Sequence, residues 1–407
     1  MKNSYINQVP DEWKIKKFTE LIDKKRIRIG KIKKNNYLSE GKYPIIDQGQ
    51  DFIAGYTNTK ALVYDGKLPV IIFGDHTRIF KYVIFPFVAG ADGTQIIRPN
   101  IQLIIPKYFY YALLNTPIIS RGYSRHYSLL KMKEILVPPL VEQSGIVEVL
   151  GTVDECIRLT EEVIGRAEEL KRGLMQRLLT RGIGHTEYKQ TSLGEIPKTW
   201  DTIKYEQANE RIFVGIATSS TQHMSDQGIP LIRNQNIKEG MIDLTDLVYI
   251  TKRFSEANKS KMIKENDILT VRTGYTGQSC KVEKEMEGWQ TFTTIISRPN
   301  LREFDPDFIV NFLNSPLARN QILSLEAGLA QKNLNVRWIS NLLIPKPPLL
   351  EQQKISQMIK KIYNYREIVI SEKNHLMLIK QGLMQLLLSG EVRVELRENG
   401  LHRIGNS

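Results

Sequence analysis

The stretch "VPPLVEQSGI" (residues 137–146) decides the fold, because the chain repeats it almost unchanged as "KPPLLEQQKI" (residues 346–355). Pro-Pro-Leu, Glu-Gln and Ile stand at matching positions in the two stretches, which lie 209 residues apart in a chain of 407 residues. A long helical pattern follows each of them. Chance rarely places so many residues at equal spacing, so the sequence indicates an internal duplication.

Further matches extend the duplication along the whole chain. Their offset varies between 186 and 200 residues before the repeated stretch, and then stays at 209 for over forty residues. Loops absorb insertions, whereas a packed helix in a fixed register does not, so each half is expected to be a variable globular module followed by a rigid helix. The matching segments are "VPDEW" with "IPKTW" (9–13, 196–200), "YPII" with "IPLI" (43–46, 229–232), "GTQIIRPN" with "TTIISRPN" (93–100, 293–300), "LLNTP" with "FLNSP" (113–117, 312–316), and "LKRGLMQRLL" with "IKQGLMQLLL" (170–179, 379–388).

Apolar residues recur in steps of four and three along both helical patterns. Starting at Ile146, eight of ten such positions are apolar, and starting at Ile355, seven of ten are. This spacing, held over about five heptads, predicts a coiled-coil seam on each helix. The first seam comprises Ile146, Leu150, Val153, Ile157, Thr160, Ile164, Ala167, Lys171, Leu174 and Leu178, and the second Ile355, Ile359, Ile362, Arg366, Val369, Lys373, Leu376, Lys380, Leu383 and Leu387.

Charge predicts that the two helices pair with each other. Residues 141–180 carry a net charge of −3 and residues 351–388 a net charge of +3, which favours pairing within the chain over self-pairing of either helix. The proline pairs at 138–139 and 347–348 suit helix starts, and Gly182 and Gly390 suit helix ends. In an antiparallel pair, the module before each helix would lie at an opposite end of one rod.

These patterns predict a mixed α+β fold with a pseudo-two-fold internal repeat. Two globular α/β modules would be separated by two long antiparallel coiled-coil helices. The expected order is a first module at 1–139, a first spacer helix at 140–182, a central linker at 183–197, a second module at 198–347, a second spacer helix at 348–389 and a C-terminal tail at 390–407.

The positive charge of the chain is concentrated in the first module. Residues 1–140 contribute +11 of the net charge of +13, whereas residues 191–345 are about neutral. In the densest stretch, "KKRIRIGKIKK" (24–34), Arg26 and Arg28 alternate with isoleucines, as in a strand with one basic face. Such a face suits a polyanion such as nucleic acid, and an ordinary solvated strand is the alternative. The second module would have to rely on local rather than net charge.

The sequence lacks the motifs of several enzyme classes. It contains no Asn/Asp-Pro-Pro-aromatic motif of an amino-methyltransferase and no glycine-rich phosphate loop. Cys156 and Cys280 have no partner at ligand spacing, which argues against a disulfide framework or a zinc site. No apolar run approaches 18 residues and the N-terminus lacks an apolar signal core, so a cytoplasmic protein without membrane contact is expected. These absences favour a binding protein over an enzyme.

The repeated motifs resemble those of a known family. Two copies of "PPLxEQ", each followed by a long helix that ends in "GLMQxLL", are similar to the specificity subunits of type I restriction-modification systems. The central segment "GHTEYKQTSLGEIPKTW" (184–200) is similar to the segment that opens the second recognition domain in that family. The resemblance covers nearly the whole chain, and the helical motifs are its more specific part.

This resemblance implies a non-catalytic DNA-binding subunit. Each module would be a target-recognition domain that reads one half of a split, asymmetric sequence in double-stranded DNA, and the helices would set the spacer between the halves. The helices would also dock two methyltransferase subunits, which bind S-adenosylmethionine and methylate adenine. A restriction and translocase subunit would join through the complex, and no cofactor is expected in this chain.

Candidates for DNA contact are polar and aromatic residues in turn-rich segments, because such side chains read base edges and phosphates. Hydrogen-bonded turns use the same residue types, which is the alternative for each of them. The candidates in the first module are Arg26, Arg28, Gln48, Gln50, Asp75, His76, Thr77, Arg78, Ser124, Arg125 and His126. Those in the second are Arg233, Asn234, Asn236, Arg272, Thr273, Tyr275, Gln331, Lys332 and Asn333.

Two pairs of residues at matching repeat positions have other expected roles. Trp13 and Trp200 are expected in the core. Met175 and Met384 could either dock the methyltransferase partner or add burial inside the coiled coil.

Two rival functions stay open. The chain could be a self-contained DNA methyltransferase or nuclease with an unrecognised site, which binding of S-adenosylmethionine by the isolated chain would reveal. It could also be a coiled-coil scaffold whose globular ends bind proteins, which sequence-selective DNA protection by the assembled complex would exclude.

Overall fold

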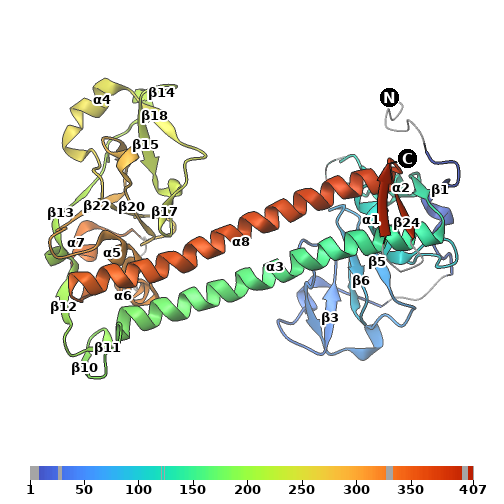
Figure 1. The fold of residues 1–407 in the computed structure, drawn as a ribbon, viewed down its shortest axis with the longest axis horizontal. Coiled ribbons are helices and arrows are strands. Elements are labelled where there is room, and N and C mark those ends of the chain that lie inside the picture. Colours follow the sequence, from blue (N-terminus) through green and yellow to red (C-terminus); the bar gives the residue numbers. More distant parts are fainter. Residues whose placement is uncertain are drawn as a thin grey trace. The chain divides into compact units, whose positions relative to one another are not determined.

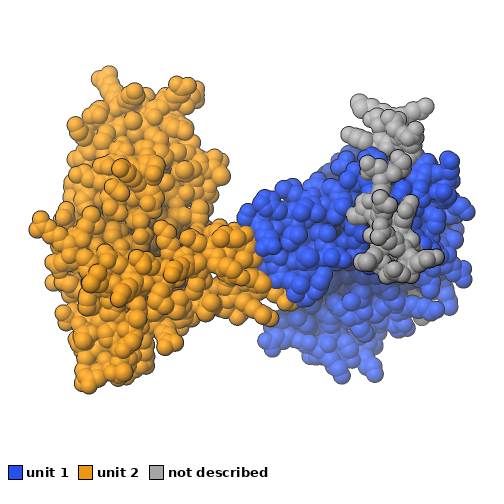
Figure 2. Space-filling view, in the orientation of Figure 1, with its two compact units in different colours: residues 1–161, 371–407 blue, residues 162–370 orange. Residues whose placement is uncertain are grey.

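The computed structural model describes residues 9–25, 30–120, 122, 124–326, 333–396 and 402–406. The chain divides into two compact units, residues 1–161 with 371–407 (unit 1) and residues 162–370 (unit 2), which Figure 2 shows in different colours. Each unit therefore combines one globular module with a part of each long helix, and the boundary between the units crosses both helices.

The two long helices are α3 (Leu140–Arg181) and α8 (Leu349–Ser389), drawn in green and red in Figure 1. Each begins directly after a proline pair. Each is followed by a glycine in the left-handed region, Gly182 with φ +62° and Gly390 with φ +82°. Glycine favours that conformation because it has no Cβ, so the predicted starts and ends of both helices are confirmed.

The predicted seam lies inside the helix pair, since all twenty seam positions are buried or half-buried. Three of its four charged members, Arg366, Lys373 and Lys380, form ion pairs with acidic residues of the other helix, whereas Lys171 pairs with Glu239 of the module. In unit 1 the partner's number falls as the residue number rises, so the helices run antiparallel there, as the sequence predicts. The pairs are Lys380–Asp154 (2.6 Å) and Lys373–Glu161 (2.7 Å) in unit 1, and Arg366–Glu168 (2.7 Å) in unit 2.

Unit 1 contains three sheets of its module and a terminal hairpin. The strand β5 is buried along its whole length at the centre of one sheet, which suits its run of Val, Ile and Phe. The sheets are β1 (Lys14–Lys17) with β9 (Glu134–Val137); β2 (Lys31–Ile32), β7 (Val88–Gly90), β3 (Tyr43–Ile46) and β4 (Gly55–Thr57) in that order; and β6 (Phe80–Val83), β5 (Val70–Gly74) and β8 (Thr94–Ile97). The helices are α1 (Pro106–Leu114) and α2 (Tyr127–Lys131), and β24 (Val392–Leu396) pairs with β25 (His402–Asn406).

Unit 2 repeats this plan with additions. Two four-stranded sheets form its module, β13 (Asn209–Val214), β22 (Ile295–Pro299), β19 (Ile268–Thr270) and β20 (Ser279–Lys281), and β14 (Met224–Ser225), β18 (Val248–Ile250), β15 (Ile229–Arg233) and β21 (Gln290–Phe292). Three strand pairs accompany them, β12 (Asp201–Lys204) with β23 (Leu343–Lys346), β10 (Tyr188–Thr191) with β11 (Gly194–Pro197), and β16 (Ile237–Lys238) with β17 (Met241–Ile242). Its shorter helices are α4 (Lys252–Ala257), α5 (Pro306–Leu313), α6 (Pro316–Glu326) and α7 (Val336–Ser340).

The glutamine of the repeated motif explains why the motif recurs. The side-chain oxygen of Gln143 accepts a hydrogen bond from the backbone N–H of Ile105, just before α1, and its Nε2 donates to the carbonyl of Pro138. Gln352 makes the same two contacts with Asp305, just before α5, and with Pro347. Both glutamines are fully buried, so each one fixes a helix of the module to the start of a long helix.

The neighbouring glutamate holds the tryptophan at the start of each module. The indole N–H of Trp13 donates to Glu142 (2.8 Å), and that of Trp200 donates to Glu351 (3.0 Å). Both tryptophans are buried, which confirms the prediction that they belong to the core.

Burial also decides between the two roles considered for the repeated methionines. Met175 packs in the core of unit 2, and Met384 packs in the core of unit 1. Both side chains are buried, so of the two roles considered the structure favours burial over a docking surface. Separately, no helix among the described residues is long and apolar enough to cross a membrane.

Candidate nucleic-acid interface

The three candidate segments of the first module come together in unit 1. They are the loop after β3 (47–51), the turn after β5 (75–78) and the residues that lead into α2 (124–127), of which Tyr127 is the first helical residue. The backbone N–H of His76 donates to the side-chain oxygen of Gln48 (3.1 Å). Asp75 connects the turn after β5 with the residues 124–127. Its carboxylate accepts the N–H of Tyr127 (2.7 Å), and its backbone oxygen lies 2.9 Å from Nδ1 of His126.

Hydrogen bonds from Lys81 and Tyr37 also fix the loop after β3. The ammonium group of Lys81, on β6, donates to the backbone oxygens of Asp47 and Asp51, which stand at the two ends of this loop. Burial lowers the pKa of Lys81, although the charges of Asp47 and Asp51 oppose this effect. The hydroxyl of Tyr37 donates to Asp47, and burial raises the pKa of that hydroxyl, so it stays neutral. The loop is therefore fixed before any ligand arrives.

Exposure separates the candidates of unit 1 into two groups. Asp75 and His126 are buried, and their hydrogen bonds build the interface from inside. Gln48, His76 and Ser124 are half-buried. The exposed side chains, which a ligand could reach, are those of Gln50, Thr77, Arg78 and Arg125.

The three candidate segments of the second module also meet, in unit 2. The side-chain amide of Asn234, after β15, donates to the hydroxyl of Thr273 (3.0 Å), in the loop after β19. Two hydrogen bonds connect Leu334, just before α7, with Arg272. The backbone N–H of Leu334 donates to the backbone oxygen of Arg272, and the side-chain Nε of Arg272 donates to the backbone oxygen of Leu334.

In unit 2, too, some candidates build the loops while others face outward. Asn236 is buried, accepts the N–H of Arg233 and donates to the oxygen of Asp243, so it closes its own turn. Thr273 is exposed, and Tyr275 is 78% exposed at the tip of its loop.

Two carbonyl oxygens at this interface have no hydrogen-bond donor. The side-chain oxygens of Asn234 and Asn333 are buried without a partner among the described residues. Buried polar atoms of this kind are normally satisfied, and these two oxygens are closed to solvent in this structure.

The two interfaces are built on equivalent elements. One segment follows β3 or β15, one follows β5 or β19, and one precedes α2 or α7. The candidates Arg26, Arg28, Gln331 and Lys332 lie outside the described residues. Within the described part, no group of three or more His, Cys, Asp or Glu side chains could hold a metal ion.

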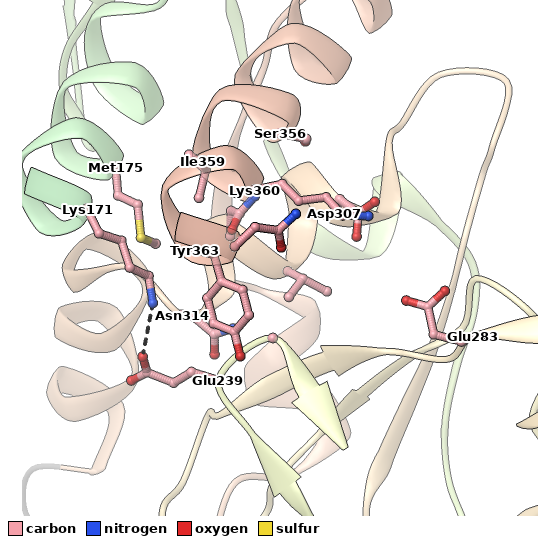
Figure 3. Close-up of a pocket in the computed structure, with 14 residues that line it drawn as sticks. Lys171, Met175, Glu239, Glu283, Asp307, Asn314, Ser356, Ile359, Lys360 and Tyr363 are labelled. Carbon is pink, nitrogen blue, oxygen red and sulfur yellow. Dashed lines mark ion pairs between the residues drawn. The ribbon is translucent and has the colours of Figure 1, made fainter. Parts of the chain in front are cut away.

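Unit 2 also contains a pocket where its module meets the long helices (Figure 3). Lys171 and Met175 reach it from α3, Tyr363 from α8 and Asp307 from α5. The ammonium of Lys171 pairs with Glu239 (3.9 Å), in the turn between β16 and β17. Asp307 pairs with Lys281 (3.0 Å). These charges are neutralised within the fold, so the pocket is best described as the junction between module and helices.

The sequence model of the family described as "Type I restriction modification DNA specificity domain" matches residues 10–169 and 187–377. The chain belongs to this family. It is a specificity subunit of the type I restriction-modification class with two target-recognition domains, one in each unit, as the resemblance implied.

Curated relatives agree with this assignment. The putative type I restriction enzyme MjaX specificity subunit of Methanocaldococcus jannaschii is 26% identical over 97% of each chain. The EcoR124I/EcoR124II specificity subunit of Escherichia coli is 25% identical over 81% of each chain.

Solved structures share the fold at low identity. The type I S subunit from M. genitalium aligns over 95% of this chain and 98% of its own, with a TM-score of 0.58 and 16% identity. A chain from a structure that describes complex assembly of the type I R-M system gives a TM-score of 0.56 at 11% identity, over 94% of this chain and 98% of its own.

Proposed function

We propose that each target-recognition domain reads one half of a two-part target in double-stranded DNA. The observation that carries this proposal is the convergence of three polar segments on equivalent elements in both units. Each cluster combines loops fixed by internal hydrogen bonds with exposed side chains. Fixed donors and acceptors can discriminate between base pairs, because each base pair presents its own pattern in the major groove.

The two halves of the target differ in sequence. Gln50 and Arg125 are exposed in the first interface, whereas Thr273 and Tyr275 are exposed in the second. Different side chains on equivalent scaffolds select different base edges, so the target is asymmetric. Two readers on one chain also fix a gap of unread base pairs, because paired helices hold a distance that a flexible linker would not.

The chain itself is non-catalytic, and its partners carry the chemistry. Two methyltransferase subunits, which bind S-adenosylmethionine, methylate adenine within the target, and a restriction and translocase subunit joins through the complex. The names of the relatives, specificity subunits of type I restriction enzymes, support this division of labour.

Apolar side chains on the long helices supply the surface for the methyltransferase partners. Leu170 on α3 is 60% exposed, and Ile368 on α8 is 66% exposed, both in unit 2. In unit 1, Leu378 of α8 is 64% exposed. None of the three belongs to the seam, so the partner can cover them without opening the helix pair.

A map of methylated adenines tests the whole proposal. Cells would carry this chain with a methyltransferase subunit, the methyltransferase alone, or this chain alone. Methylation that needs both chains, at a two-part motif with a constant gap, is the expected result. Replacing residues 1–139 by the first module of another specificity subunit should change one half of the motif only.

Each other outcome favours a rival. Methylation by this chain alone would reveal a catalytic site of its own. Methylation without a sequence motif, or none with both chains present, would favour the protein-binding scaffold.

A further inference from the structure

A short basic segment lies beside the recognition loop of unit 1. The strands β2, β7 and β3 are parallel, with Ile32 of β2 level with Gly90 of β7 and Ile46 of β3 level with Ala89 of β7. Carboxyl ends of parallel strands share one edge of a sheet. Lys33, the residue after β2, therefore lies at the same edge as the loop 47–51, which follows β3.

The surface beside this segment is concave. Its lining includes the polar residues Lys31, Lys33, Asn36, Asn58 and Thr59 together with the apolar residues Ile32, Leu38 and Leu62. The ammonium of Lys31 donates to the oxygen of Thr94 (2.9 Å). Within the part of the chain that the structure describes, the side chains of Lys33 and Asn36 form no hydrogen bond or ion pair.

A second lysine strengthens the charge at this point. Lys34 follows directly, is exposed, and likewise has no acidic partner among the described residues. No carboxylate lines the hollow, so its positive charge is not neutralised from within. A concave surface with ammonium, amide and hydroxyl donors has the chemistry that binds a phosphate group.

The second module lacks this charge at the equivalent position. Ile216 forms a parallel bridge with Phe292 of β21, as Ile32 pairs in parallel with β7. The oxygen of Ile216 accepts the N–H of Thr293 (2.9 Å), just as the oxygen of Ile32 accepts that of Ala91 (2.6 Å). The residues that follow Ile216 are Ala217 and Thr218, both exposed and uncharged.

We propose that the hollow lined by Lys31, Lys33 and Asn36, with Lys34 beside it, binds a backbone phosphate of DNA next to the first half of the target. This inference rests on the proposed function, because Lys33 lies at the sheet edge that carries the recognition loop. Asn58 and Thr59 line the hollow from the other end of β3, where Asn58 accepts the N–H of Lys42. The proposed site gives the first module a phosphate contact that does not depend on DNA sequence, and the second module lacks such a contact. The first module therefore captures the duplex, and the second contributes mainly selection among base pairs.

The salt dependence of the DNA-binding constant measures this phosphate contact directly, because binding of phosphates releases counterions. The full chain would be titrated with a duplex of random sequence and with a duplex carrying the methylated motif, from about 50 to about 200 mM salt. The variant Lys33→Ala with Lys34→Thr carries the residues of the second module. It should bind both duplexes more weakly by the same factor, with a slope of log K against log salt that is shallower by about 1 to 2.

Two further variants separate a local contact from a loss of net charge. Lys14→Ala with Lys17→Ala removes two exposed charges from β1, in a different sheet, and should leave the slope nearly unchanged. Ala217→Lys with Thr218→Lys adds the pair to the second module and should steepen the slope. Ala217 and Thr218 are exposed, so the added lysines need not disturb the fold. This variant therefore tests the phosphate contact even if Lys33→Ala with Lys34→Thr fails to fold.

Several results would overturn the inference. An unchanged slope, or a change equal to that of the β1 variant, excludes a phosphate contact at the hollow. Loss of binding to the target duplex alone would make Lys33 and Lys34 base-reading residues. Inorganic phosphate that raises the melting temperature of the wild type only, with no effect of the variant on DNA binding, would show a site for free anions. Failure of the proposed function is visible separately, because the random duplex needs no two-part motif.

Discussion

Two adjacent residues at the start of each long helix attach the preceding module. Gln143 and Gln352 satisfy backbone groups, whereas Glu142 and Glu351 bind side chains from other parts of the chain. Glu142 accepts Trp13 and also the guanidinium of Arg393 (2.6 Å). Its hydrogen bonds raise the pKa of Arg393, so the guanidinium stays charged. Removing one partner of such a buried network leaves the others unsatisfied.

The variant Glu142→Ala should loosen unit 1 and spare unit 2. It leaves the indole N–H of Trp13 and the charge of Arg393 without their acceptor, at a cost of about 2 to 4 kcal/mol. Amide hydrogen exchange should become faster in residues 10–22 and 140–150 and stay unchanged in unit 2. Glu351→Ala is the matched variant and should have the reverse distribution. Equal loosening of both units by either variant would contradict the assignment.

The segments of the interface could be predicted from the sequence, but the outward-facing residues could not. Runs of polar residues after apolar strands predict loops at a sheet edge, and these loops do meet. Which side chains face outward depends on hydrogen bonds between distant segments, such as Gln48 with His76. Asp75 and Asn236 look like ligand contacts in the sequence, yet both are buried. The basic stretch 24–34 could be predicted to suit a polyanion from its lysine density, but the hollow at Lys33 could not, because it depends on strand order.

Tyr275 should contribute to target binding without contributing to stability. Its ring is 78% exposed, so Tyr275→Ala removes little packing. Loss of a base contact costs about 1 to 3 kcal/mol of discrimination, or roughly 5-fold to 150-fold in affinity. The methylated motif should relax in one half only, and the salt slope should stay constant. Tyr365→Ala, on α8, removes another exposed tyrosine and should leave the motif intact; a motif altered equally by both variants would argue against Tyr275.

At the scale of elements, the helix pair was the most predictable part of the molecule. Its heptad spacing and its opposite charges act along the chain and need no knowledge of loops. Of the charged residues that interrupt the seam, Arg366, Lys373 and Lys380 pair with acidic residues of α3, which favours the antiparallel partner, whereas Lys171 pairs with Glu239 of the module. The sheets were less predictable, because several of their strands have only two or three residues.

The seam pair of Asp154 and Lys380 should make unit 1 sensitive to acid. Burial alone raises the pKa of Asp154, but hydrogen bonds from Lys380 and Tyr111 outweigh it and hold the pKa below its usual range. A carboxylate with a lowered pKa contributes stability above its unfolded pKa of about 3.9 and loses it as pH falls through the folded value. Asp154→Asn should therefore cost about 1 to 2 kcal/mol at neutral pH, and the cost should shrink as pH falls through the lowered pKa of Asp154.

Hydrogen exchange of unit 1, measured for wild type and Asp154→Asn between neutral and acidic pH, checks this difference. Asp305 is the matched control with opposite sign, because burial raises its pKa and its protonation relieves a cost. Asp305 lies in unit 2, so Asp305→Asn should raise the relative stability of unit 2 at neutral pH, and hydrogen exchange there should show this gain fading as pH drops. A penalty for Asp154→Asn that stays constant with pH would contradict the role of its charge.

At the scale of the whole molecule, the core of unit 1 contains residues from both ends of the sequence. Met384, Leu387 and Leu388 of α8 lie in the core of unit 1, together with Trp13, and Val394 joins them. Residues far apart in sequence thus complete one core. The corresponding contacts of unit 2 come from its own linker, where the N–H of Ile183 and the ring of His185 bind Glu351. The core of unit 1 is therefore complete only when the end of α8 and β24 pack against the first module.

Deletion of residues 371–407 should disrupt unit 1, although it removes no residue of the first module. The deletion takes away four buried apolar side chains and Arg393, and losses of this kind cost about 2 to 5 kcal/mol each in a packed core. Unit 2 keeps every residue of its own core, so hydrogen exchange should rise in residues 9–161 and stay low in residues 190–345. A separate peptide of residues 371–407 should restore protection when added in excess, since it supplies the missing contacts. Protection of unit 1 in the deleted chain without this peptide, at concentrations too low for two chains to associate, would show that the module folds independently of the returning helix.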